Sequence, residues 1–170
     1  TTTVPDPFEA ITQAVRHLPA DVLIGAGTVL DAETARQAVG AGAAFIVSPV
    51  LAIDVLKAAH ALGAAAIPGC FSPTEIWTAR RAGADAVKVF PATSLGPQYF
   101  TDLRAPIPHL RLVPTGGVSL ANAGAWIRAG AMAVGAGTAL VDGEAVKRGD
   151  WTAIRRRARQ FVDAVAEARR

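Results

Sequence analysis

Short apolar segments alternate with segments of helical periodicity along the whole chain. Apolar strands are expected to begin near Val22, Ala44, Ala64, Ala86, Arg111 and Met132, about 20 to 25 residues apart. A helical pattern fills each interval between them. A strand followed by a helix at this period predicts parallel β/α units.

Several expected helices carry recognisable start signals. Asp6-Pro7 places an N-cap residue before a proline at the first helical position, and this predicts a helix that runs to about Leu18. Ser72-Pro73-Thr74-Glu75 has the form of a capping box, and Asp31 or Ser119 can cap a helix similarly.

The joints from helix to strand share one pattern, a glycine after a small or apolar residue. These glycines are Gly42, Gly63, Gly83 and Gly130. Each fits the position after a helix C-cap, which favours glycine because it takes the left-handed conformation.

The opposite ends of the strands carry glycine, proline, serine and threonine. The segments are Gly25-Ala26-Gly27-Thr28, Ser48-Pro49, Pro68-Gly69-Cys70, Phe90-Pro91, Pro114-Thr115-Gly116-Gly117 and Gly135-Ala136-Gly137-Thr138. In a parallel barrel these positions share one rim, the face on which such folds place their chemistry.

One lysine lies in the middle of the apolar strand 84–92. Side chains alternate between the two faces of a strand, so Lys88 lies opposite Val87 and Val89. If the valines pack under helices, Lys88 loses hydration, and its pKa should fall from about 10.4 toward about 7 to 8. Such a neutral amine can attack a carbonyl carbon.

The alternative interpretation makes Lys88 an edge residue whose charged end reaches solvent. Residue usage favours the first interpretation, because only Lys57, Lys88 and Lys147 are lysines among 17 lysine and arginine residues. Arginine cannot form a Schiff base, so a lysine at this position is informative.

Length and composition predict one globular domain, residues 1–170, in which 51% of the residues are hydrophobic. No uninterrupted apolar run approaches the roughly 18 residues of a membrane span, so no membrane partner is expected, and the polar start is not a signal peptide. Cys70 is the single cysteine, which suits a reducing compartment. We therefore expect a cytoplasmic protein.

The net charge of +3 does not predict a nucleic-acid-binding protein. Much of the positive charge lies in the C-terminal segment with Arg155, Arg156, Arg157 and Arg159, whose apolar positions form a helical stripe. The arginines are expected to form the solvated face of that helix. The three histidines show no metal-ligand spacing, so neither a metal nor another cofactor is expected.

Two glycine-rich turns end the last two expected strands. Pro114-Thr115-Gly116-Gly117 and Gly135-Ala136-Gly137-Thr138 would let backbone N–H groups approach an anion, and loops at these places hold phosphate in many β/α barrels. Simple tight turns are the alternative, and the pairing of two such turns favours a phosphate site.

The rim motifs together resemble a known family. Ile24-Gly25-Ala26-Gly27-Thr28-Val29, Ser48-Pro49, Ile67-Pro68-Gly69, Val87-Lys88-Val89-Phe90-Pro91-Ala92, Leu95-Gly96-Pro97-Gln98-Tyr99 and Pro114-Thr115-Gly116-Gly117-Val118 are similar to the 2-keto-3-deoxy-6-phosphogluconate (KDPG) and 4-hydroxy-2-oxoglutarate (KHG) aldolases. The resemblance covers essentially the whole chain, in the right order.

The resemblance implies a (β/α)8 TIM barrel, commonly a homotrimer, and a role for each rim residue. Lys88 resembles the Schiff-base lysine. The residues that resemble the keto-acid pocket are Thr28, Pro49, Phe90 and Thr115, and those that resemble the phosphate pocket are Gly116, Gly117, Gly137 and Thr138. The implied substrate is a phosphorylated 2-keto-4-hydroxy acid.

The chain also departs from the family pattern at its start. The first β/α unit and most of strand 2 have no counterpart, and the family's general acid–base glutamate would lie two positions before Thr1. Thr3 stands where many members have an arginine that binds the substrate carboxylate. We expect a truncated sequence or a misplaced start rather than a barrel with an open seam, because unpaired strand edges and uncovered helix faces favour aggregation.

The leading hypothesis is a class I aldolase that cleaves KDPG or a related acid to pyruvate and an aldehyde. Two alternatives remain. One is a catalytically impaired barrel that acts as a binding or assembly protein, and the other is a different phosphate-binding barrel enzyme, an isomerase or a synthase.

Overall fold

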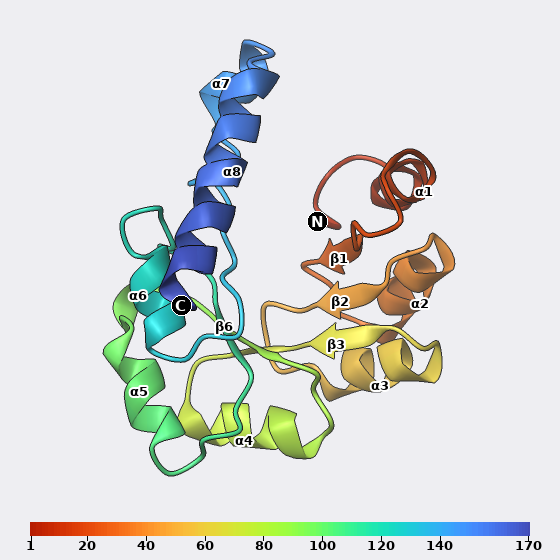
Figure 1. Cartoon of the computed structure of the whole chain (residues 1–170). Helices are drawn as coiled ribbons and strands as arrows, with labels where there is room; N and C mark the ends of the chain where they lie inside the picture. The colour runs from red at the N-terminus through yellow and green to blue at the C-terminus, as the bar shows by residue number, and fades with distance from the viewer. The chain divides into compact units, whose positions relative to one another are not determined.

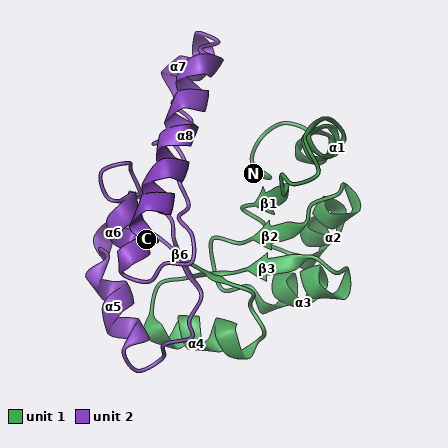
Figure 2. Cartoon of the chain, in the orientation of Figure 1, with its two compact units in different colours: residues 1–88 green, residues 89–170 purple.

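The computed structural model describes residues 1–170, which divide into two compact units, Thr1–Lys88 and Val89–Arg170 (Figure 2). Strand β5, Val87–Val89, contains the boundary between the units. We describe each unit by itself.

The first unit repeats a strand followed by a helix. Its other elements are α1 Pro7–His17, β1 Gly25–Gly27, α2 Ala32–Gly40, β2 Phe45–Val47, α3 Ile53–Ala61, β3 Ala65–Ile67, β4 Gly69–Cys70 and α4 Pro73–Arg81. Strands β1, β2 and β3 are parallel neighbours, and Ala26, Ile46 and Ala66 lie in one register row (Figure 1). All three are buried, because α2 and α3 pack against this sheet.

The second unit is mostly helical. Its elements are η1 Ala92–Ser94, α5 Gln98–Arg104, β6 Leu112–Pro114, α6 Ala123–Arg128, α7 Gly143–Lys147 and α8 Trp151–Ala168. Phe100 and Trp126 meet edge to face, with ring centroids 4.9 Å apart and an interplanar angle of 64°. Both rings are buried, as is Leu112 of β6, so these side chains form the centre of the core of this unit.

The predicted glycine joints are confirmed. Gly42, Gly63, Gly83 and Gly130 each follow a helix C-cap residue and have φ values of 105°, 78°, 98° and 95°. A side chain at these positions would be strained, since L residues rarely adopt this region.

The predicted helix starts are confirmed in part. Ser72 and Glu75 form a complete capping box, and Asp31 accepts a hydrogen bond from the Thr34 amide. Asp6 precedes α1 as expected, but its side chain forms no capping hydrogen bond, because its own backbone is left-handed at φ 45°. Ser119 is not the N-cap residue of the next helix: α6 begins three residues later than a Ser119 cap would require, with Asn122 at the N-cap position.

Two predicted strands differ from the structure. The first begins at Gly25 rather than near Val22, because the Val22 amide donates to the Pro19 carbonyl in a turn. The segment from Met132 forms only one bridge, between Thr115 and Gly135. The Leu112 carbonyl accepts a hydrogen bond from the Met132 amide, and the Pro114 carbonyl accepts one from the Gly135 amide. Pro114 has no N–H to donate in return, so the hydrogen-bond ladder between the two segments is incomplete.

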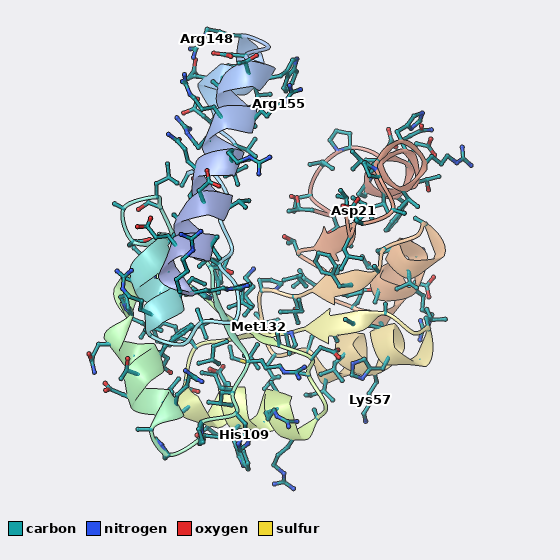
Figure 3. The ribbon with its side chains drawn as sticks, in the orientation of Figure 1. Asp21, Lys57, His109, Met132, Arg148 and Arg155 are labelled. Carbon is teal, nitrogen blue, oxygen red and sulfur yellow. The ribbon has the colours of Figure 1, made fainter.

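Helix α8 has the expected charged face and an incompletely covered apolar face. Arg155 extends from the helix into solvent (Figure 3). On the apolar face Phe161 is buried, whereas the neighbouring residue Val162 is 57% exposed. Within this unit the face borders an open hollow of about 450 Å³ lined also by Val134, Leu140 and Val165. No helix of the chain has the length and apolar character needed to cross a membrane.

Candidate active site

In the first unit, two predicted site residues follow the carboxyl ends of neighbouring strands, and Lys88 lies within β5. Thr28 follows β1, and Pro49 lies two residues beyond β2. The Ser48 amide donates to the Ile67 carbonyl on β3, and the Lys88 amide donates to the Pro68 carbonyl directly after β3. The parallel register and these hydrogen bonds therefore place Thr28, Pro49 and Lys88 at a similar level along their strands.

Lys88 differs from the other two lysines in its surroundings. It is half-buried between the buried residues Val87 and Val89. Burial lowers the pKa of the Lys88 amine, because desolvation penalises the charged form, so the predicted direction is confirmed. Lys57 projects from α3 into solvent (Figure 3), and Lys147 is exposed and paired with Glu144 at 2.8 Å. Lys88 is therefore the lysine whose neutral fraction at neutral pH is raised.

Thr28 is held in a backbone conformation that a β-branched residue rarely adopts. Its φ is +63°, in the left-handed region. Two hydrogen bonds from Thr2 hold the turn: its amide donates to the Gly27 carbonyl at 2.9 Å and its hydroxyl to the Thr28 carbonyl at 2.8 Å. Strain of this kind gathers at functional sites, so the conformation supports Thr28 as a site residue.

Thr28→Gly is expected to stabilise the fold by about 0.5 to 1 kcal/mol. Glycine removes a left-handed strain of about 1 to 2 kcal/mol, and the greater freedom of the unfolded chain offsets part of that gain. The midpoint of urea unfolding measures the effect. Thr78→Gly, at an exposed position of α4, is the matched control and should lower the midpoint, because its backbone is helical. A lower midpoint for Thr28→Gly as well would show that Thr28 is not strained.

Pro49 is fixed by close backbone contact. A Cβ atom on Gly69 would collide with the Pro49 backbone, and the Gly69 amide donates to the Val50 carbonyl. Ser48 before it is 1% exposed, and its hydroxyl accepts from the Val50 amide at 3.3 Å. The only residue that allows this approach is glycine at position 69.

Glu75 and Cys70 lie at the same end of the first unit but are not suited to catalysis. The Glu75 carboxylate accepts hydrogen bonds from the Ser72 amide, the Phe71 amide and the Ser72 hydroxyl, and these bonds lower its pKa. An ionised capping group of this kind cannot serve as a proton donor near neutral pH. Burial raises the pKa of the Cys70 thiol to about 12, and the Glu75 charge adds to this effect, so the thiol is not an activated nucleophile.

In the second unit, the loop after β6 presents unused backbone donors. The Thr115 amide donates to the Val89 carbonyl, and the Ala92 amide to the Thr115 carbonyl. Gly116 and Gly117 follow with φ values of 88° and 71°, and their N–H groups meet no acceptor in the protein. Consecutive amides left free by such a turn are typical of anion-binding nests.

The neighbouring loop also carries free amides. Thr115 and Gly135 form a parallel bridge, and a Cβ atom on Gly135 would collide with the Thr115 hydroxyl. Gly137 and Thr138 are exposed, and their N–H groups donate to no carbonyl. Gly137 has no left-handed φ and no close neighbour that would require a glycine. The space next to its backbone is open.

Sequence reasoning missed two residues that hold these loops. Thr2 fixes the turn at Thr28, and Asn122 forms hydrogen bonds with the loop that contains Gly117. Asn122 is the only asparagine of the chain, and an asparagine three residues after a serine at a helix start was the available signal. Thr2 lies in a polar terminal segment and gave no signal.

Known structures share this architecture. "Native KDPGal structure" is 34% identical, with a TM-score of 0.89, and the match covers 98% of this chain and 80% of the other. "Crystal Structure of KDPG Aldolase from Legionella Pneumophila with pyruvate captured at low pH as a covalent carbinolamine intermediate" is 28% identical, with a TM-score of 0.79 over 96% of this chain and 77% of the other. The protein is therefore an α/β protein with a TIM-barrel-like fold.

Sequence comparison gives the family. The profile described as "Aldolase: KDPG and KHG aldolase" matches residues 1–157. A probable 2-dehydro-3-deoxy-6-phosphogalactonate aldolase of Rhizobium meliloti (strain 1021) is 40% identical over 137 residues, which cover 80% of this chain and 65% of that protein. This chain belongs to the KDPG and KHG aldolase family.

Proposed function

We propose that the protein is a class I aldolase that cleaves a phosphorylated 2-keto-4-hydroxy acid, such as KDPG or a related sugar acid, to pyruvate and an aldehyde. The observation that carries the proposal is the half-buried Lys88 in the middle of β5, whose pKa is lowered by burial. Membership of an aldolase family supports the same reaction type.

The rim residues take the roles that the resemblance implies. Lys88 is the nucleophile, and Thr28, Pro49, Phe90 and Thr115 form the keto-acid pocket. The strained Thr28 and the fixed Pro49 support this assignment on the first unit.

Gly116, Gly117, Gly137 and Thr138 form the phosphate pocket. The support comes from the second unit, where the N–H groups of these four residues are without acceptors. Free backbone amides can bind phosphate oxygens without a charged side chain.

The chemistry follows from a neutral amine. Lys88 attacks the C2 ketone, and loss of water from the carbinolamine gives an iminium ion. A base removes the proton of the C4 hydroxyl, the C3–C4 bond breaks, and its electron pair moves toward the positive nitrogen. The aldehyde leaves, the enamine takes a proton at C3, and hydrolysis releases pyruvate and returns the amine.

The proton-transfer group is not assigned to a residue of this sequence. The resemblance places the family's glutamate two positions before Thr1, and Glu75 is already engaged in its capping box. We further propose that residues 1–170 belong to one (β/α)8 barrel domain. A homotrimer in the cytoplasm, with no nucleic-acid or membrane partner, belongs to the same proposal.

Trapping with pyruvate and borohydride tests the proposal, because it needs only Schiff-base formation. We expect one reduced pyruvate adduct per chain, located on Lys88 by peptide mass spectrometry. An unchanged mass, or an adduct on Lys57 or Lys147 alone, would overturn the assignment. A binding or assembly protein, or an isomerase or synthase on the same fold, would give the unchanged mass, since none of these needs an amine at position 88.

A further inference from the structure

Asn122 forms two hydrogen bonds with the loop after β6. Its side-chain Nδ2 donates to the Gly117 carbonyl at 2.9 Å, and its Oδ1 accepts from the Ser119 amide at 2.8 Å. An amide side chain is required for this pair, because one end must donate and the other must accept. No other side chain forms a hydrogen bond with residues 116–119.

Two hydrogen bonds hold the peptide units on either side of the free amides. A peptide unit is planar, so the Ala92 amide on the Thr115 carbonyl fixes the unit that carries the Gly116 N–H. The Asn122 side chain on the Gly117 carbonyl fixes the Gly117–Val118 unit. Gly116 and Gly117 both have positive φ values, and glycine has no Cβ atom to restrict rotation. The Gly117 N–H belongs to the Gly116–Gly117 unit between these two. Without the bond from Asn122 that unit has several accessible orientations, and only some of them direct the Gly117 N–H to the same point as the Gly116 N–H.

Packing limits the loop on its other side. A Cβ atom on Gly117 would lie 2.8 Å from the Thr93 hydroxyl, and one on Gly116 would lie 3.5 Å from the Phe90 ring. The loop therefore rests against η1, while the amide of Asn122 holds its carbonyl from the start of α6. The contact with η1 on one side and the hydrogen bond from Asn122 on the other together restrict the loop to one conformation.

We propose that Asn122 is a positioning residue for phosphate, which holds the Gly117 amide in the orientation that binds, together with the Gly116 amide, the phosphate group of the substrate. This inference rests on the proposed function and adds to it a residue outside the rim motifs. Asn122 does not touch the substrate; it acts through the backbone of Gly117.

Asn122→Ala tests the proposal with glycerol 3-phosphate, a simple phosphate monoester, as the probe. We expect its affinity, measured by titration calorimetry, to fall about 10-fold, since fixed donors lose their preorganisation. The rate of pyruvate trapping at Lys88 should stay within about twofold of the original protein. In turnover assays the loss should appear in KM for a phosphorylated substrate rather than in kcat.

Two further variants separate positioning from general damage. Asn122→Asp keeps the acceptor for the Ser119 amide and removes the donor to Gly117, so it should lose at least as much affinity as Asn122→Ala. Gln13→Ala is the matched control: it removes a neutral side-chain amide whose hydrogen bond goes to Glu9 on α1, and affinity should not change.

The possible results are distinct. Unchanged glycerol 3-phosphate affinity in Asn122→Ala, or an equal loss of affinity and of pyruvate trapping, would overturn the role of Asn122. Absence of binding in the unaltered protein would also overturn it, together with the phosphate pocket. Failure of pyruvate trapping in the unaltered protein would instead remove the aldolase proposal and leave the phosphate measurements to decide on Asn122.

Discussion

Lys88→Arg is expected to lower kcat/KM for aldol cleavage at least about 10⁴-fold, because a guanidinium cannot form an iminium ion with the keto acid. The measurement is a coupled assay of pyruvate release, and far-UV circular dichroism checks that the fold is retained. Lys57→Arg on the exposed face of α3 is the control and should keep its activity. Cleavage by Lys88→Arg at the original rate would contradict the Schiff-base mechanism.

Phe100→Ala is expected to destabilise the second unit by about 3 to 5 kcal/mol. The Phe100 side chain is fully buried and packs edge to face on Trp126, so truncation leaves a cavity and removes an aromatic contact. A loss of this size is a large share of the roughly 5 to 15 kcal/mol that stabilises a typical protein. Urea unfolding followed by circular dichroism measures it.

Trp151→Ala provides the comparison for this core substitution. Trp151 begins α8 and is 60% exposed, so its truncation should change the free energy of unfolding by less than about 0.5 kcal/mol. Similar losses for the two variants would mean that the Phe100–Trp126 contact is not central to the core.

Local sequence signals predicted the features that depend on one residue or one turn. The left-handed glycines at 42, 63, 83 and 130 follow from the conformational freedom of glycine. The capping box of Ser72 and Glu75 follows from the spacing of two side chains on one turn. The lowered pKa of Lys88 follows from its place between two buried valines.

Features that depend on neighbouring segments were not predictable in this way. The expected strand at Met132 fails because its neighbour has a proline at position 114, which cannot donate to the ladder. The left-handed Thr28 depends on hydrogen bonds from Thr2, 26 residues away in the sequence. The α6 start depends on Asn122, whose side chain turns back to the preceding loop instead of capping the helix.

The single thiol of the chain has a consequence for how the protein can be followed in solution. Cys70 is 3% exposed, and its pKa of about 12 leaves almost no thiolate at neutral pH. An alkylating reagent therefore reaches a reactive sulfur only in molecules in which the structure around Cys70 has opened. The rate of labelling thus reports that opening without any engineered probe.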